Sequence, residues 1–419
     1  MVFDTLGALA ARFTSRTTLL QPAIDTLAAR ATETLARQLR LAQIASPTGA
    51  EQQRAAAIES LFRELGWQTR ISEVGNVVAS RTANSQSKVA EDIGPVVCLA
   101  HLDSVFPLST VLNPTLEGTR HICPGIGDNC RGLTSIVALA EVLGASAQSS
   151  SLNVRRPIEF VATVGEEGLG NLRGAQHYFA ERDANGAPRA HAAIVIDGAG
   201  DSTIVHHGLG SRRFRISFRG KGGHSWADFG TPNSVHAAAR ATTWLADLPH
   251  TFNQRVALTV SRIGGGESIN SIPSEAWMDV DVRSTDAAVL DLVETELRTI
   301  VESAARAEFQ PRNGVEVKSP NALATQIEIT GARPTGSLPL EHPLIRSAQF
   351  ATRMHGVEPI SAVASTDANV PLSLGIPAIT IGGGGTGGGA HTLNEWYDNT
   401  NATRGLARAL AILVTAAAD

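Results

Sequence analysis

Residues 96–103 read VVCLAHLD, an uninterrupted apolar run from Val96 to Ala100 followed at once by a histidine and, two positions later, by an aspartate. A short apolar run without alternation is typical of a strand that is covered on both faces of a sheet. Three more runs have this form, at Ile158 to Val164, Ala192 to Ile196 and Pro377 to Ile381. Together the four runs predict an α/β sheet with buried strands.

The segments around these runs have helical patterns. Leu133 to Leu143 follows the glycine turn Gly125 to Gly132, and Leu172 to Glu181 follows the second run. Leu6 to Leu41 also predicts helix, and Arg81 to Asp92 predicts a polar loop. Strands that alternate with helices in this way favour an α/β domain with a mixed sheet flanked by helices.

The pattern changes near Ser211. Arg213 to Arg219 and Arg255 to Arg262 alternate polar and apolar residues, as antiparallel strands with one exposed face do. We expect an inserted α+β domain at 211–331, within a discontinuous first domain of 1–210 and 332–419. Its expected elements are a strand at Arg213 to Arg219, a helix at Ser234 to Leu245, strands at Val256 to Ile263 and Ala276 to Arg283, a helix at Ala287 to Ala307, and a last strand at Val315 to Lys318 or Gln326 to Thr330.

Composition excludes several classes of protein. The net charge is -5 over 419 residues, without a Lys/Arg cluster, so we expect neither nucleic acid nor an anionic membrane as partner. The odd set of Cys98, Cys123 and Cys130 favours a reducing compartment over a disulfide framework, which predicts a cytoplasmic protein. Charged residues such as Asp4 and Arg12 interrupt the first apolar stretch, so neither a signal peptide nor a membrane span is expected. A small-molecule substrate is the expected partner.

Each of the four buried runs is followed by a side chain that can bind a metal ion. These are His101, the pair Glu166 and Glu167, Asp197, and His391 beyond a glycine-rich loop. Open α/β sheets bind ligands at the carboxyl ends of their strands, so these side chains are expected at one edge of the sheet. One histidine or aspartate after a strand is more often part of a capped turn, but four such placements favour a metal site.

Neighbouring residues refine this prediction. Asp103 points the same way as His101 from an extended chain, so its carboxylate can accept the second N–H of the imidazole. Glu166 and Glu167 point apart if the chain is extended, so one can bind a metal ion while the other reaches a metal-bound water. Asp128 lies in a glycine turn before a helix, where capping that helix is the simpler role.

The chain resembles the M20 family of metallopeptidases over nearly its whole length. That family includes di- and tripeptidases, carboxypeptidase G2-like enzymes, acetylornithine deacetylases and aminoacylases. The resemblance implies a catalytic domain of the zinc-exopeptidase type, an inserted lid and dimerisation domain, and a homodimer. It rests on AHLDSV, GIGDNCRG, EEGLGNLRGA, VIDG, GKGGHS, NSIPSEAWMDVDVRS, STDAN and AHTLNEWYD, in that order.

This resemblance implies two divalent metal ions and divides the ligands between them. Asp128 would bridge the ions, His101 and Asp197 would complete one site, and Glu167 and His391 would complete the other. Each ion then receives an imidazole, a private carboxylate and a share of Asp128, a mixed N/O set that suits zinc, with cobalt or manganese as alternatives. The peptide bond after the bridging aspartate is cis in the family.

The resemblance also assigns the catalytic groups. Glu166 would be the general base that activates the metal-bridging water, supported by Asp103 behind the metals. His224 would stabilise the oxyanion, often from the partner subunit. Asn270 and Arg283 match the family's substrate-binding residues, and a guanidinium suits a substrate carboxylate. The second domain is expected to close over the first as a lid.

The leading hypothesis is therefore a di-zinc exopeptidase that cleaves short peptides, and the alternative is an N-acyl amino acid amidohydrolase. Two remote alternatives are a dinucleotide-dependent oxidoreductase and a non-catalytic binding protein. Gly382 to Gly389 formally fits the G-x-G-x-x-G fingerprint, but it leads into AHTLNEWYD and not into a βαβ unit. We expect these glycines to let the backbone pass close to substrate and to place His391.

Overall fold

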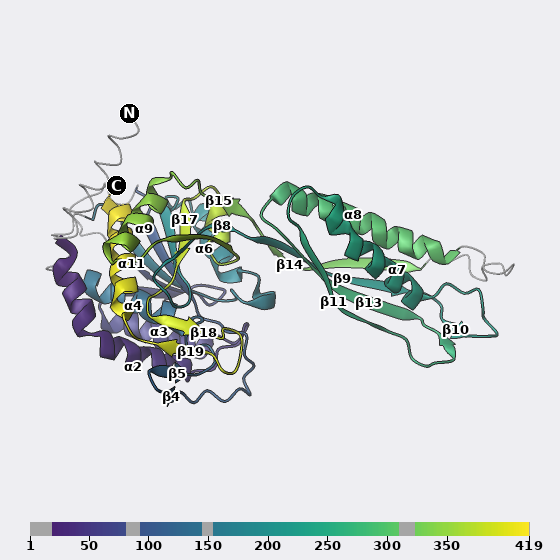
Figure 1. The fold of residues 1–419 in the computed structure, drawn as a ribbon, viewed down its shortest axis with the longest axis horizontal. Helices are drawn as coiled ribbons and strands as arrows, with labels where there is room; N and C mark the ends of the chain where they lie inside the picture. Colours follow the sequence, from purple (N-terminus) through teal and green to yellow (C-terminus); the bar gives the residue numbers. More distant parts are fainter. Residues whose placement is uncertain (1–18, 81–92, 145–153, 310–322, 419) are drawn as a thin grey trace. The chain divides into compact units, whose positions relative to one another are not determined.

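The computed structural model describes residues 19–80, 93–144, 154–309 and 323–418. The chain divides into two compact units, the first made of Met1–Gly208 with Ser337–Asp419 and the second of Leu209–Gly336 (Figure 1). Among the described residues, no helix is both long and apolar enough to cross a membrane.

The first unit is built on a mixed sheet in the order β1-β2-β6-β3-β7-β17-β8-β15, with β16 beside β8. Its four central strands, β6, β3, β7 and β17, are parallel neighbours and almost wholly buried. The α/β class predicted from the sequence is thus confirmed. The strands are β1 (Gln68–Ile71), β2 (Val77–Ser80), β3 (Val96–His101), β6 (Ile158–Thr163), β7 (Ala192–Ile196), β8 (Thr203–Gly208), β15 (Gly336–Ser337), β16 (Ile360–Ala364) and β17 (Ala378–Ile381).

Helices pack against this sheet, with α4 and α11 on β3, α6 on β6 and α9 on β8. Nearly every residue of α4 is buried, because a helix that is apolar on all sides must be covered on all sides. The helices are α2 (Ala31–Ala42), α3 (Gln52–Glu64), α4 (Cys130–Gly144), α6 (Arg173–Ala184), α9 (Pro343–Met354), α10 (Asn369–Ser373) and α11 (Ala402–Ala418), with a 3-10 turn η2 (Gly168–Gly170).

A second, smaller sheet in this unit has the order β18-β19-β5-β4. It joins β4 (Thr115–Glu117) and β5 (Arg120–Ile122) to β18 (Thr386–Gly388) and β19 (Trp396–Asp398). Its strands are too short to show a pattern in the sequence, and they were not predicted. The sheet brings together two segments that are far apart in the chain.

Two expectations fall partly outside the described residues. Within Leu6 to Leu41, residues 19–29 and α2 are helical on either side of a turn at Arg30, while residues 6–18 lie outside the described part. The loop expected at Arg81 to Asp92 lies wholly outside the described residues.

The three cysteines are free and buried.

The second unit is a four-stranded antiparallel sheet in the order β11-β13-β9-β14, with α7 and α8 packed on one face (Figure 1). Side chains of β13 alternate between buried and half-buried, because successive residues of a strand point to opposite faces of the sheet. Of the two candidate last strands, Gln326 to Thr330 lies within β14, and Val315 to Lys318 lies outside the described residues. The elements are β9 (Gly210–Arg219), β10 (Gly223–His224), α7 (Ser234–Asp247), η3 (Leu248–Thr251), β11 (Ala257–Gly265), β12 (Ser271–Ile272), β13 (Glu275–Ser284), α8 (Ala287–Arg306), η4 (Ala307–Phe309) and β14 (Ala324–Arg333).

Candidate metal centre

The side chains expected to bind metal come from the carboxyl ends of the four central strands. His101 is the last residue of β3, and Asp197 directly follows β7. Glu166 and Glu167 follow β6 after a two-residue bend, and His391 follows β17 after the glycine-rich loop. Because these strands are parallel neighbours, their ends meet at one edge of the sheet.

Two groups of candidate ligands share Asp128. In the first group, Nε2 of His101 lies 3.0 Å from Oδ1 of Asp128 and 3.6 Å from Oδ1 of Asp197. In the second, Nε2 of His391 lies 3.2 Å from Oδ2 of Asp128 and 2.9 Å from Oε1 of Glu167. The two oxygens of one carboxylate therefore face two different histidines, as a bridging ligand must.

The chemistry of this donor set fits divalent cations. Four carboxylates and two imidazoles are gathered there, and such a concentration of negative charge requires positive charge nearby. Hydrogen bonding to Asp128 raises the pKa of His391 to about 9. Burial opposes a charge on His101, yet hydrogen bonds to aspartates outweigh burial and raise its pKa well above the ordinary value. The carboxylates thus favour a positive charge close to the imidazole nitrogens. Metal ions held between these nitrogens and the carboxylates would supply that charge.

Glu166 and Glu167 leave the end of β6 at a turn that contains Gly165 in the left-handed region, with φ 62°. Both side chains are buried, and each offers an oxygen to a third group centred on His101. Only Glu167 also belongs to the group with His391. Glu166 therefore lies beside His101 but belongs to neither of the two groups that share Asp128.

Asp103 has more partners than the imidazole that the sequence predicts for it. Nδ1 of His101 lies 3.1 Å from the carbonyl oxygen of Asp103 and 3.5 Å from its carboxylate. The carboxylate accepts the backbone N–H groups of Glu166 and Glu167, at 3.0 and 2.9 Å, and the hydroxyl of Thr48 at 2.8 Å. Burial would raise the pKa of Asp103, but hydrogen bonds, that of His101 first, lower it. Asp103 thus positions the turn that carries both glutamates.

Asn129, and not Asp128, takes the capping role at the start of α4. Its Oδ1 accepts the N–H of Gly132 at 2.9 Å and that of Gly198 at 3.1 Å, and its Nδ2 donates to the carbonyl of Ile196 at 3.0 Å. The carboxylate of Asp128 is therefore free to face the histidines. The peptide bond between Asp128 and Asn129 is cis, as the resemblance implied.

Two buried acids at this edge had no role in the sequence prediction, although both belong to quoted motifs. Glu395, in AHTLNEWYD, accepts backbone N–H groups of the turn that carries Asp128. Asp367, in STDAN, accepts the hydroxyl of Thr163 at 2.5 Å through Oδ2, and burial raises its pKa to about 6.

The first glycines of the glycine-rich loop are buried against the chain's own backbone. Gly382 to Gly385 are buried, and a Cβ at Gly382 would lie 2.3 Å from the carbonyl oxygen of Ala199. At Gly384 it would lie 2.2 Å from the carbonyl oxygen of Ala402. These glycines are needed because the chain packs against its own backbone. The expectation that the loop lets the backbone pass close to substrate and places His391 stays a prediction.

Three predicted site residues, His224, Asn270 and Arg283, belong to the second unit, whereas the candidate metal ligands belong to the first. His224 pairs with Ser271 between β10 and β12, and the carbonyl of Asn270 accepts the N–H of Ser225 at 3.0 Å. Nδ1 of His224 accepts the N–H of Trp226 at 3.2 Å, so the neutral ring carries its proton on Nε2. His224 and Asn270 are both exposed and close together.

Arg283 lies at the other end of this sheet. Glu275, the first residue of β13, pairs with Arg219, the last residue of β9. The strand β10, which carries His224, lies just beyond this end of β9 (Figure 1). Arg283 pairs instead with Ser211, and its Nε donates to Asp281 at 2.7 Å. The eight steps along the chain from Glu275 to Arg283 span about 26 Å at about 3.3 Å each. One copy of the second unit therefore does not bring Arg283 and Asn270 to the same substrate group.

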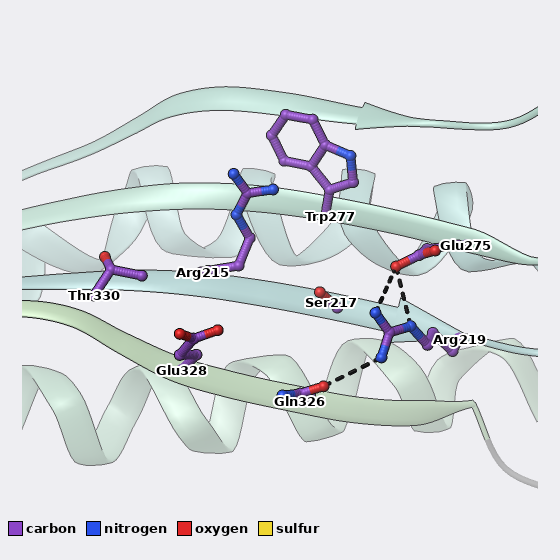
Figure 2. Close-up of a pocket in the computed structure, with 8 residues that line it drawn as sticks. All are labelled: Arg215, Ser217, Arg219, Glu275, Trp277, Gln326, Glu328 and Thr330. Carbon is purple, nitrogen blue, oxygen red and sulfur yellow. Dashed lines mark hydrogen bonds and ion pairs between the residues drawn. The ribbon is translucent and has the colours of Figure 1, made fainter.

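A pocket of about 340 Å³ lies on the face of the second unit's sheet that α7 and α8 leave open (Figure 2). Its basic side chains are already paired, since Arg219 contacts Glu275 and Gln326. Arg215 pairs with Asp279, and its guanidinium lies 4.1 Å from the ring centroid of Trp277. The pocket holds none of the candidate metal ligands, and its balanced charges favour no particular ion.

Comparison with protein families gives two matches that adjoin along the chain. Residues 76–206 match the model described as peptidase family M28, and residues 208–308 match the peptidase dimerisation domain of M20 proteins. No curated protein sequence gives a significant match.

Solved structures share the fold over almost the whole chain. A tripeptidase from Staphylococcus aureus has a TM-score of 0.74 at 20% identity, covering 93% of this chain and 99% of its own. The YXEP protein of Bacillus subtilis, described as a dinuclear metal-binding M20 peptidase, has a TM-score of 0.66 at 16% identity, covering 92% and 98%. An amidase of the hydantoinase/carbamoylase family from Burkholderia multivorans has a TM-score of 0.61 at 18% identity, covering 93% and 98%.

The fold, the family matches and the cluster of His, Asp and Glu side chains define a metal-dependent hydrolase. The chain belongs to the M20/M28 peptidase family, and within it to the M20-type metallopeptidases and amidohydrolases.

Proposed function

We propose that this chain is a di-zinc exopeptidase that hydrolyses the amide bond of short peptides. The observation that carries the proposal is the shared carboxylate of Asp128, whose two oxygens face His101 and His391 at 3.0 and 3.2 Å. With Asp197 on one side and Glu167 on the other, the donors divide into two equivalent sets. Each set has the imidazole and carboxylates that suit zinc.

Zinc ions held by these ligands would lower the pKa of a shared water and polarise the substrate carbonyl. Glu166 is the proposed general base, because its carboxylate is buried beside His101 and Asp103 holds its backbone. It accepts a proton from the attacking water as the C–O bond forms. It then delivers that proton to the amine nitrogen as the C–N bond breaks, which balances the hydrolysis.

The substrate class is supported by the fold neighbours. They include a tripeptidase from Staphylococcus aureus and an amidase from Burkholderia multivorans, so an N-acyl amino acid remains the second candidate. The dinucleotide alternative loses support, because the buried glycines of 382–385 pack against protein atoms, whereas a dinucleotide loop must leave its backbone open to a phosphate.

The second unit contributes to the proposal through His224 as oxyanion donor and through Asn270 and Arg283 as substrate-binding residues. Their exposure supports such roles, since His224 and Asn270 are exposed and the Arg283 side chain is 41% exposed. Arg283 would bind the free carboxylate of the substrate through charge-assisted hydrogen bonds.

The test of the chemistry is Glu166→Gln, which keeps the shape of the side chain but removes the base. We expect kcat to fall by about 10²–10⁴-fold, the usual contribution of a general base, while two zinc ions per chain remain bound by elemental analysis. Glu341→Gln, at an exposed position in the same unit, is the matched control and should retain full activity. A metal-free protein with full activity, or an unimpaired Glu166→Gln, would contradict the proposal.

The test of substrate class is a hydrolysis screen of the zinc-loaded protein against dipeptides, tripeptides and N-acyl amino acids. A kcat/KM at least tenfold higher for peptides supports the exopeptidase. The reverse preference assigns the N-acyl amino acid amidohydrolase instead. Peptides with an amidated carboxyl terminus should be poorer substrates if a basic side chain binds the free carboxylate.

A further inference from the structure

Glu395 is a buried acid between the two turns that supply Asp128 and His391. Only 2% of the residue is exposed. Its Oε2 accepts the N–H of Gly125 at 2.6 Å, and its Oε1 accepts those of Gly127 and Asp128, both at 2.8 Å. One side chain therefore receives three backbone N–H groups of the turn that carries the shared carboxylate.

The backbone around Glu395 joins the same two segments. Its carbonyl accepts the N–H of Cys123 at 2.9 Å, and the next residue, Trp396, pairs with Ile122 between β19 and β5. On the other side, the N–H of Glu395 donates to Thr392 at 3.2 Å, which closes the turn next to His391. The turn with His391 and the turn with Asp128 are thus connected through one residue.

The turn is shaped to receive this carboxylate. A Cβ at Gly127 would lie 3.0 Å from Oε1 of Glu395, so a larger residue there would press on the acceptor. Hydrogen bonds to an ionised acceptor are about twice as strong as neutral ones. An amide in place of the carboxylate would turn an NH₂ group toward at least one backbone N–H, leaving a buried donor without an acceptor.

We propose that Glu395 is a positioning residue that sets the distance between Asp128 and His391 and so builds the metal site of His391, Glu167 and Asp128. This inference rests on the proposed two-metal function. The other site draws His101 and Asp197 from strand ends, which depend less on the turns. Loss of the Glu395 carboxylate should therefore weaken the His391 site more than the His101 site.

The experiment measures zinc affinity in Glu395→Gln and Gly127→Ala by competition with a chelating dye, together with the unfolding temperature of the metal-free proteins. We expect one of the two zinc ions to bind about 10–100-fold less tightly in Glu395→Gln, the usual cost of losing a group that orients metal ligands, while the other ion changes little. Glu117→Gln, exposed in the same small sheet, is the control and should match the wild type.

Gly127→Ala should shift the same ion in the same direction, and the double variant should be no weaker than Glu395→Gln alone, because both changes act on one contact. If Glu395→Gln and Gly127→Ala bind two zinc ions as tightly as the wild type, the positioning role is wrong while the two-metal function stands. If both ions weaken equally in step with a lower unfolding temperature, Glu395 is only structural and the inference is overturned. A wild type that binds no zinc refutes the proposed function itself.

Discussion

Asp103 joins three parts of the candidate metal centre through its own atoms. It lies beside His101, accepts the N–H groups of Glu166 and Glu167, and receives the hydroxyl of Thr48. A carboxylate can accept all of these bonds at once because it has no proton to donate. The first histidine is oriented through the backbone carbonyl of Asp103, and the turn with the proposed base is held through its carboxylate. Both therefore depend on one residue.

Asp103→Asn keeps the size of this group but replaces one acceptor oxygen with an NH₂ donor. We expect metal affinity or kcat to fall about 10–100-fold, as is typical for partners of metal ligands. Zinc competition and steady-state kinetics measure the two effects. Asp183→Asn, exposed in α6, is the control. Unchanged affinity together with unchanged kcat in Asp103→Asn would show that the carboxylate has no positioning role.

At the level of elements, the loop before His391 is held between two helices. The guanidinium of Arg131 in α4 donates to the carbonyl of Gly383 at 2.8 Å, and α11 passes directly over the next residue. A Cβ at Gly405 would lie 2.3 Å from the backbone of Gly384. The contact explains a glycine inside α11, where alanine would otherwise form the better helix by about 1 kcal/mol.

Gly405→Ala should therefore destabilise the protein in spite of its helix propensity. We expect the free energy of unfolding to fall by about 1–3 kcal/mol, the usual cost of an overpacked contact, as measured by urea denaturation. Arg404→Ala, on the exposed side of the same turn, should change it much less. Equal or greater stability in Gly405→Ala would mean that α11 and the loop separate without cost.

At the scale of the whole molecule, the second unit has its own core. Phe214, Phe218 and Met278 are fully or almost fully buried within it. Residues 208–308 match a peptidase dimerisation domain, and Arg283 lies at the opposite end of the sheet from Asn270. If both act on one substrate, as proposed, they belong to different copies of the chain, which requires a homodimer.

Mixed dimers test this prediction. Glu166→Gln and His224→Ala should each be nearly inactive alone, but a dimer with one of each contains one site with both native residues. Random mixing should restore about one quarter of wild-type activity, because about half of the dimers are mixed and each has one intact site. Glu166→Gln mixed with Asp103→Asn should regain nothing. Absence of recovery in purified mixed dimers would refute the trans role of His224.

Much of the fold and of the ligand set is predictable from local sequence. The four apolar runs correspond to β3, β6, β7 and β17, because a fully buried strand requires continuous apolar residues whatever lies around it. His101 and Asp197 lie at the ends of these runs, and Glu166 and Glu167 follow within a few residues, so their common edge follows from parallel pairing alone. The alternating strands of the second unit were predictable for the same local reason.

Only the tertiary structure decided which groups hold the site together. Glu395 meets Gly125 and Asp128 across 270 and 267 positions of sequence, and the glycines of 382–385 are explained by backbone contacts with Ala199 and Ala402. The periodicity of a sequence reports which face of an element is buried, but it carries no information on the partner that a buried polar atom finds. Hydrogen bonds and close contacts are set by where distant segments meet, and that is fixed only when the chain folds.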